Sequence, residues 1–178
     1  MRAGVLEARG HVILFTDADL SAPIEEASKL IDPIRRGEAA VAIGSRGLDS
    51  KLIGVHQSPM RELAGRTFNL VMRMMTGLPF KDTQCGFKAF RRDAARDIFS
   101  RVRIERFGFD VEALYLARKL GYETREIPVI WNHVEGTTVS VASGIAAFAD
   151  PLRVRLNDVR GLYTARAVAS RSLSSLAK

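Results

Sequence analysis

Two uninterrupted apolar runs, separated by one helix-like segment, constrain the fold of this chain more than any other feature. "HVILF" (His11 to Phe15) and "AAVAIG" (Ala39 to Gly44) have the length and composition of strands buried on both faces. Residues 21–31 begin with a serine and a proline, followed by two glutamates, which are helix-start signals. Asp32-Pro33 is predicted to bend or end that helix. Strand, helix and strand in this order predict a βαβ unit and therefore an α/β fold.

The rest of the chain continues the alternation of helices and strands. Periodicity and glycine or proline stops predict a helix tail over 2–8, a polar loop over 45–58, an amphipathic helix over 59–76, a strand over 85–90, a helix over 91–99, a helix over 110–120 and a strand over 123–131. Pro128 favours an edge position for the last of these strands. Residues 145–176 are predicted to be helical and are rich in arginine.

Two aspartates follow the first apolar run, in "FTDADLSAP" (Phe15 to Pro23). If Asp17 ends the strand and Asp19 begins the loop, both carboxylates lie at the carboxyl edge of the sheet, where open α/β sheets bind ligands. Mg²⁺ typically takes one or two carboxylates and completes its shell with water and phosphate oxygens. The alternative is a pair of solvated loop acids, with Asp19 capping the next helix. This short pattern alone leaves both interpretations open.

Other charged residues are predicted near the same edge. "IGSRG" ends the second strand and places Arg46 where it could face a phosphate, although a surface arginine has the same pattern. "DTQCGFKAF" puts Asp82 just before a strand. Asp110 and Glu112 begin a helix, where capping and the helix dipole explain acids as well as catalysis does.

Composition narrows the class of partner. The 178 residues suffice for one domain with a sizeable core, and the formal net charge of +7 suits an anionic partner: nucleic acid, a phosphorylated substrate or an anionic membrane surface. Aromatic residues make up 7% and are not interleaved with basic ones, which disfavours a nucleic-acid stacking platform. The single cysteine, Cys85, excludes an intramolecular disulfide and is expected to be a small core residue.

Several segments together resemble family 2 glycosyltransferases, in particular the dolichyl-phosphate β-glucosyltransferase branch and its bacterial polyprenyl-phosphate relatives. They share order and spacing with that family: "FTDADLSAP", "IGSRG", "SPMRELAGRTFN", "DTQCGFKAF" and "RFGFDVEALYLARKLGYETREIPVIW". The resemblance covers about residues 1–135. It implies a GT-A (Rossmann-like) nucleotide-diphospho-sugar transferase fold, in which the D-x-D pair, Asp17 and Asp19, holds Mg²⁺ or Mn²⁺ on the donor diphosphate.

The resemblance also implies a reaction and residue roles. A hexose, glucose from UDP-glucose, would be transferred with inversion to a polyprenyl or dolichyl phosphate. Arg46 would bind the donor, and Arg61 and Arg66 would bind the acceptor phosphate, unless these two are solvated helix charges. Arg61 and Asp82 would be the catalytic residues. Asp82 would bind sugar hydroxyls or steer the attack. The acceptor is already anionic near pH 7, because the second pKa of a phosphate monoester is about 6, so it needs positioning more than a general base.

The chain departs from the family pattern at two places. Relatives begin with a strand ending in a Pro-x-Tyr-Asn-Glu-like turn and further βα units, whereas Met1 falls in the helix before "HVILFTDADL". Residues 1–140 are therefore interpreted as the C-terminal two-thirds of a GT-A domain that lacks the N-terminal βα units and their base pocket, which puts the activity of the chain alone in question. The second departure is "EGTTVS", in which Thr138 replaces a basic residue.

The C-terminal residues 141–178 are predicted to form a basic amphipathic helical segment. Apolar residues recur every three or four positions from Ile145 and are flanked by arginines, as in helices that lie in a membrane interface. This predicts a peripheral location on the cytoplasmic face of a membrane. The alternative is a helix that packs across the domain with its arginines in water.

Other interpretations stay open at this point. Within the family, a GDP-mannose-dependent polyprenyl-phosphate mannosyltransferase fits the same motifs. Outside it, the charge would suit a non-enzymatic basic nucleic-acid-binding domain, and the departure at Met1 would suit an inactive fragment. His133 is a possible metal ligand but is expected to be structural, and Trp131 is expected to pack or to line the acceptor entrance.

Overall fold

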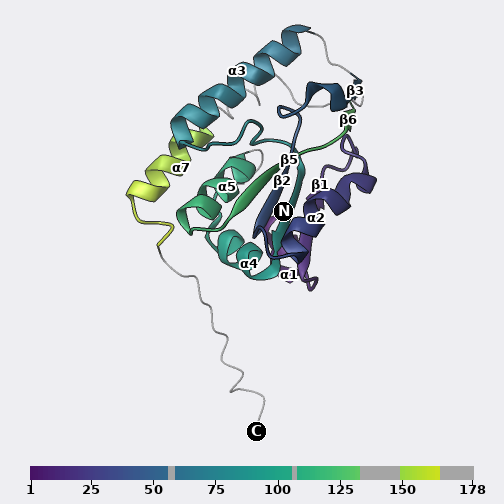
Figure 1. Ribbon diagram of the computed structural model, residues 1–178. Helices are drawn as coiled ribbons and strands as arrows, with labels where there is room; N and C mark the ends of the chain where they lie inside the picture. The colour runs from purple at the N-terminus through teal and green to yellow at the C-terminus, as the bar shows by residue number, and fades with distance from the viewer. Residues whose placement is uncertain (56–58, 106–107, 133–148, 165–178) are drawn as a thin grey trace.

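A four-stranded sheet covered by helices on both faces forms the centre of the molecule (Figure 1). The computed structural model describes residues 1–55, 59–105, 108–132 and 149–164. Its elements are α1 (Arg2–Glu7), β1 (Val12–Thr16), the 3-10 turn η1 (Ile24–Glu26), α2 (Ala27–Arg35), β2 (Val41–Ser45), the 3-10 turn η2 (Ser50–Leu52), β3 (Ile53–Val55), α3 (Pro59–Thr76), β4 (Phe87–Arg91), α4 (Arg92–Arg101), α5 (Phe109–Lys119), β5 (Thr124–Pro128), β6 (Trp131–Asn132) and α7 (Asp150–Val159). The predicted α/β class is confirmed.

The order of the sheet is β1-β4-β2-β5, and β3 pairs with β6 in a second, two-stranded sheet. β4 is antiparallel to both β1 and β2, whereas β2 and β5 are parallel. β1 and β2 therefore point the same way, as a βαβ unit requires, but they are not neighbours because β4 lies between them. β5, which ends at Pro128, is an edge strand as predicted.

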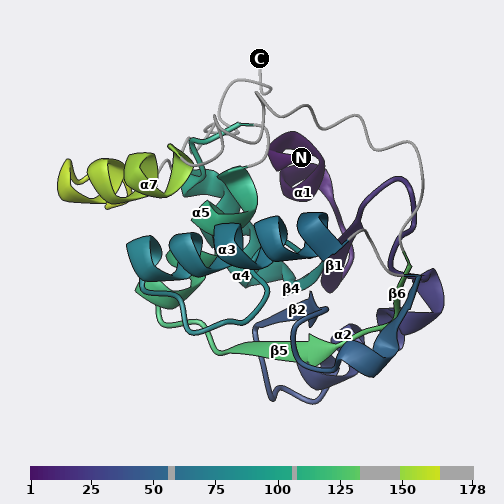
Figure 2. The ribbon, with the colours of Figure 1, turned by 90° about the horizontal axis from the view of Figure 1, so that it is seen from above.

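Alternate residues of the strands enter two separate cores, as the two-residue period of a strand requires. Ile13 and Phe15 of β1 pack into the larger core with α1, α4 and α5, whereas Val12 and Leu14 pack against the smaller core under α2. Figure 2 shows α2 on one side of the sheet and α1 and α5 on the other. Both faces of the sheet are thus covered, and its functional groups lie at the strand ends.

The helix predicted after Ser21 extends further than expected. Asp32-Pro33 was expected to bend or end it, but α2 continues to Arg35, with Pro33 buried in its last turn. Proline has no N–H for the bond to the carbonyl four residues earlier and its ring crowds that carbonyl, yet Pro33 lies within the helix and is buried. Gly37, just after the helix, has a φ of 73°, in the left-handed region that favours glycine.

The predicted C-terminal helix is shorter than expected. α7 spans Asp150–Val159, and residues 160–164 form a turn in which Gly161 has a φ of 70°. The turn brings Tyr163 back into the core, where its hydroxyl donates a hydrogen bond of 2.6 Å to Glu112 Oε1. Residues 145–148 and 165–176 of the predicted helix lie outside the described part. Among the described residues, no helix has both the length and the apolar character needed to cross a membrane.

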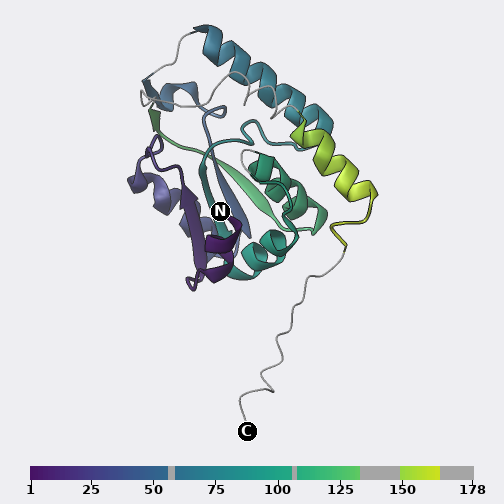
Figure 3. The same cartoon turned by 180° about the vertical axis from the view of Figure 1, so that it is seen from behind.

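α7 packs beside α3 at the outside of the larger core (Figures 1 and 3). It also contacts α5, through Tyr115, whose hydroxyl donates a hydrogen bond of 2.5 Å to Asp158 Oδ2. This pair of helices carries a group of exposed large apolar residues: Leu70, Met74, Leu152, Leu156 and Val159.

Candidate active site

Asp17 directly follows β1 and is fixed against β4. Its backbone N–H donates a hydrogen bond of 2.8 Å to the carbonyl of Gly86. Its carboxylate lies so close to the Cα of Gly86 that a Cβ at this position would overlap it. The glycine of the "TQCGFK" run is therefore explained by packing, because a larger residue would displace the Asp17 side chain.

Asp19 lies in the exposed turn after Asp17. Its Oδ1 accepts a hydrogen bond of 3.0 Å from the backbone N–H of Ser21, and Leu20 between them has a φ of 52°. Asp19 thus orders the turn before η1, and no donor among the described residues bonds its other carboxylate oxygen. Burial raises the pKa of Asp17 above its ordinary value, and the like charge of Asp19 raises it further. The two carboxylates are thus close enough to interact electrostatically, and their sharing of a metal ion stays a prediction.

Arg46 and Asp82 form a bidentate ion pair at the end of β2. Arg46 Nε lies 2.7 Å from Asp82 Oδ2, and Arg46 Nη2 lies 3.0 Å from Oδ1. The backbone N–H groups of Arg46 and Gln84 donate to the same carboxylate, at 3.1 and 3.2 Å. Burial alone would raise the pKa of Asp82, but the Arg46 guanidinium outweighs it and holds this pKa below its ordinary value. Asp82 is therefore an anion that holds Arg46 in place.

The arginine also packs against an aromatic ring. The guanidinium carbon of Arg46 lies 5.3 Å from the centre of the Trp131 ring, in a cation–π contact. About a third of the Arg46 side chain stays exposed (34%), and Asp82 binds only Nε and Nη2 of its guanidinium. Trp131 therefore packs against Arg46, and packing was one of the two roles predicted for it.

The loop that carries Asp82 is clamped from two sides. The carboxylate of Glu126 in β5 accepts hydrogen bonds from the backbone N–H groups of Lys81, at 2.9 Å, and of Asp82, at 2.7 Å. Asn69 of α3 donates to the carbonyl of Lys81 and accepts a hydrogen bond of 3.1 Å from Thr83 Oγ1. α3 is thereby tied to the edge of the sheet at which Arg46 lies.

Sequence analysis missed one functional candidate, Lys88 of β4. Its side chain is fully buried (0% exposed), and its Nζ donates to the carbonyl of Cys85, at 2.6 Å, and to Asp110 Oδ1, at 3.0 Å. The Nζ also lies 5.4 Å from the centre of the Phe15 ring. A lysine at an inward position of an otherwise apolar strand is the sequence signal that could have revealed it.

Asp110 and Glu112 have different roles at the start of α5. Asp110 is not the N-cap residue of α5, which is Gly108, but the partner of Lys88. Burial raises its pKa even though Lys88 acts to lower it, and the charges of Asp17 and Asp82 add to the increase. Glu112 binds the backbone N–H groups of Arg103 and Ile104 as well as Tyr163, so its role is structural.

The site thus consists of five charged groups around the ends of β1 and β2. Asp17, Asp82 and Asp110 supply the negative charges, and Arg46 and Lys88 supply the positive ones. Among the described residues, no group of three or more His, Cys, Asp or Glu side chains is arranged to hold a metal ion. Two carboxylates, Asp17 and Asp19, still match the number that Mg²⁺ takes when phosphate oxygens complete its shell.

The predicted acceptor residues are placed only in part. Arg61 and Arg66 lie in α3, but their side chains lie outside the described part of the structure. His133 and Thr138 also lie outside it. Cys85 is buried (2% exposed) behind β2, as expected of a core residue.

Comparisons with known proteins agree with this architecture. Residues 1–99 match the model of the family described as "Glycosyl transferase family 2". The chain is 32% identical over 170 residues to "Dolichyl-phosphate beta-glucosyltransferase ALG5D" of Trichomonas vaginalis, covering 93% of the chain and 52% of that protein.

Two further relatives give similar values. The identity is 33% over 169 residues to a dolichyl-phosphate beta-glucosyltransferase of Dictyostelium discoideum, covering 92% of the chain and 51% of the relative. It is 34% over 176 residues to the protein of that name from Saccharomyces cerevisiae, covering 92% and 52%. The chain spans about half the length of these curated relatives. Because the family model matches more than half of its residues, the chain belongs to glycosyl transferase family 2.

Proposed function

We propose that this chain carries part of the active site of a glucosyltransferase that transfers glucose from UDP-glucose to dolichyl or another polyprenyl phosphate with inversion. The names of the relatives support glucose as the sugar and dolichyl phosphate as the acceptor. The observation that carries the proposal is the convergence of Asp17, Arg46, Asp82 and Lys88 at the carboxyl ends of β1 and β2. A diphosphate donor needs such positive charge and metal-binding carboxylates at one edge of the sheet.

Asp17 and Asp19 are the proposed ligands of Mg²⁺ or Mn²⁺. Such an ion, when bound together with the donor, would neutralise the charge that develops on the leaving diphosphate. Asp17 suits this role because β4 fixes its position and because the neighbouring charge of Asp19 favours a cation between them. The buried ammonium group of Lys88 acts on both Asp17 and Asp110 and counters the repulsion between these two acids.

Arg46 is the proposed phosphate-binding residue of the donor site. Asp82 takes its Nε and one of its terminal nitrogens, which leaves further N–H donors of the guanidinium for a phosphate oxygen. Because both carboxylate oxygens of Asp82 already accept two hydrogen bonds each, Asp82 acts first as the residue that orients Arg46. Direct contact of Asp82 with sugar hydroxyls stays a prediction.

Arg61 and Arg66 of α3 are the proposed partners of the acceptor phosphate. The hydrogen bonds of Asn69 bring α3 to the loop next to Arg46, which is where an acceptor would have to meet the donor. The acceptor lipid would stay in a membrane, so the protein would have to lie at the surface of that membrane, and the cytoplasmic surface is the proposed one. The exposed apolar residues of α3 and α7, together with the arginines of α7, are the proposed contact surface.

A transfer assay with two donors tests this function. A chimera in which this chain replaces the matched segment of the Saccharomyces cerevisiae relative would be given dolichyl phosphate and Mg²⁺, with labelled UDP-glucose or GDP-mannose. We expect labelled glucosyl lipid from UDP-glucose and no product when EDTA replaces Mg²⁺. Transfer from GDP-mannose alone would overturn the proposal in favour of a mannosyltransferase, and absence of transfer together with salt-dependent DNA binding would favour a nucleic-acid-binding domain.

A further inference from the structure

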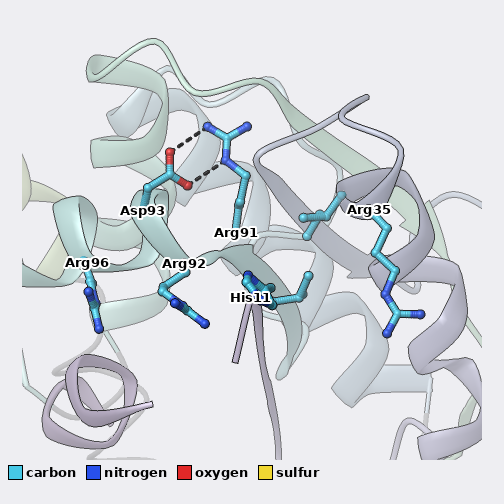
Figure 4. A pocket seen from close by; sticks show the side chains of 8 residues that line it. His11, Arg35, Arg91, Arg92, Asp93 and Arg96 are labelled. Carbon is cyan, nitrogen blue, oxygen red and sulfur yellow. Dashed lines mark hydrogen bonds and ion pairs between the residues drawn. The ribbon is translucent and has the colours of Figure 1, made fainter. Parts of the chain in front are cut away.

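A second concave site lies at the opposite end of β1 from Asp17 (Figure 4). It has a volume of about 650 Å³ and lies between the start of β1, the end of α2, the end of β4 and the first turn of α4. Its charged and polar lining consists of His11, Arg35, Arg91, Arg92, Asp93 and Arg96. The six residue steps from His11 to Asp17 correspond to roughly 20 Å along an extended strand, so this recess is separate from the candidate active site.

The recess holds more positive charge than its own residues neutralise. The only acid of its lining, Asp93, binds Arg91 through two contacts, at 2.6 and 2.8 Å. Arg92 donates to the backbone carbonyls of Gly10 and Arg9 and meets no carboxylate within the described ranges. These two arginines are held in fixed positions at the wall of the recess.

Arg35 and Arg96 are different, because neither side chain has a hydrogen bond or an ion pair with any residue in the described part of the chain. Both are exposed. In Figure 4, Arg96 projects from α4 to the same side as Arg92, and Arg35 extends from α2 across from them. The two guanidinium groups therefore lie at opposite sides of the recess, with His11 and Arg92 between them (Figure 4), so a ligand that reaches both has to extend across it.

The apolar part of the recess favours an anion with an organic part. The first turn of α4, which begins at Arg92, also borders the recess, but Asp93 in that turn offsets part of the positive end of the helix dipole. Val12 and Ile34 supply an apolar wall within the same recess. Its volume lies in the range of small-molecule sites, roughly 300–1,000 Å³.

We propose that this recess binds a small organic phosphate carrying two or more negative charges, with its phosphates between Arg35 and Arg96 and its organic part on Val12 and Ile34. Guanidinium groups suit phosphate because their paired N–H donors match two phosphate oxygens. Such a ligand would join α2 to α4 across the beginning of β1. The inference does not rest on the proposed glucosyl transfer, because it uses none of the residues at the Asp17 end of the sheet.

Binding is measured by calorimetry on the 178-residue chain, with sodium pyrophosphate and ADP as probes, in EDTA and low salt. The test variant combines Arg35→Gln with Arg96→Gln. The control combines Lys51→Gln with Arg160→Gln, which removes the same charge at exposed positions outside the recess. We expect the test variant to weaken ADP binding at least about tenfold, as the loss of charge-assisted hydrogen bonds would, and the control to change it less than about twofold.

Three outcomes would overturn the proposal. The first is equal weakening by the test and the control variants, which would show a general effect of charge. The second is ADP that binds no more tightly than pyrophosphate, which would contradict the role of Val12 and Ile34. The third comes from amide chemical-shift mapping: ADP-induced shifts at Asp17 instead of at His11 and Arg96 would place the ligand in the candidate active site.

Discussion

At the scale of single residues, the close approach of Asp17 to Gly86 is the tightest constraint in the candidate active site. Gly86→Ala is expected to destabilise the fold by about 1–3 kcal/mol, because the added methyl group overlaps the Asp17 carboxylate. In an Asp17→Ala background the same change should cost little. Urea unfolding of the double-mutant cycle measures this, and a coupling free energy below about 0.5 kcal/mol would show that the carboxylate does not occupy this position.

Lys88 is the second residue whose replacement has a defined consequence. Lys88→Met leaves Asp110 buried without its cation, which is expected to cost about 3–5 kcal/mol near pH 7. The folded-state pKa of Asp110 is raised, so its contribution favours the fold at low pH and is lost as the pH rises through that pKa.

The Lys88→Met variant should therefore regain part of its stability between pH 7 and pH 5, whereas Lys88→Met combined with Asp110→Asn should not show this gain. Denaturant unfolding at several pH values measures both variants. A loss at pH 7 that stays unchanged at pH 5 would show that Asp110 is not the group left unpaired.

The thiol of Cys85 gives a prediction about reactivity. Burial raises the pKa of Cys85 to about 12, and the side chain is 2% exposed. A thiol with an ordinary pKa near 8.5 has roughly a thousandfold more thiolate at pH 8. Labelling with a thiol reagent at pH 8 should thus be at least about a hundredfold slower in the folded chain than in urea. Comparable rates in the two states would contradict the buried position.

At the scale of elements, local patterns predicted what local forces determine. The apolar runs predicted β1 and β2, and Pro128 predicted the edge position of β5. The places of Asp17 and Arg46 just after these two strands predicted that both lie at the same edge of the sheet. The insertion of β4 between β1 and β2 and the pairing of Arg46 with Asp82 were not predicted, because both join segments far apart in sequence. Periodicity reports which face of an element is buried but not which element it meets.

The ends of helices show the same limit. The turn at Gly161 ends α7 and carries Tyr163 back to Glu112, although the apolar spacing continues through this region. Similarly, α2 continues through Pro33, a residue that usually ends helices and is buried here. In both cases the observed end of the helix differs from the one that periodicity and proline predicted.

The position of β1 at the edge of the sheet makes a prediction for hydrogen exchange. The backbone N–H of Arg92 donates a hydrogen bond to the carbonyl of His11, and that of Asp17 donates one to the carbonyl of Gly86. Between these two points, every second residue of β1 therefore forms backbone hydrogen bonds with β4. The amides of Val12 and Leu14 then face away from β4 and should exchange much faster than those of Ile13 and Phe15. Equal protection of all four amides in a dilute sample would show that another strand covers this edge.

At the scale of the whole molecule, the exposed apolar surface of α3 and α7 is the proposed membrane contact. Val159 is 88% exposed and Leu156 is 43% exposed, and both lie on α7 among arginines. Leu156→Glu with Val159→Glu should reduce co-sedimentation with anionic vesicles by at least about fivefold, because apolar insertion and charge attraction both weaken. Ile24→Glu with Ile130→Glu, on exposed apolar residues elsewhere, serves as the control.

Undiminished binding by the α7 variant, with its fold intact by circular dichroism, would contradict the proposed contact surface. A similar loss in the control would show a general effect of added negative charge. The whole chain is used in each case, because residues beyond α7 include further arginines.

The central claim is that the charged edge formed by β1 and β2 is a metal-dependent glucosyl-transfer site. Its most direct test is the rate of glucose transfer by the chimera when it carries Asp19→Asn, with Asp93→Asn at the opposite end of the sheet as the matched control. We predict that Asp19→Asn lowers the rate at least about a hundredfold with the fold intact, whereas Asp93→Asn leaves it nearly unchanged. Full activity of the Asp19→Asn variant, or unchanged activity of the unsubstituted chimera in EDTA, would contradict the account.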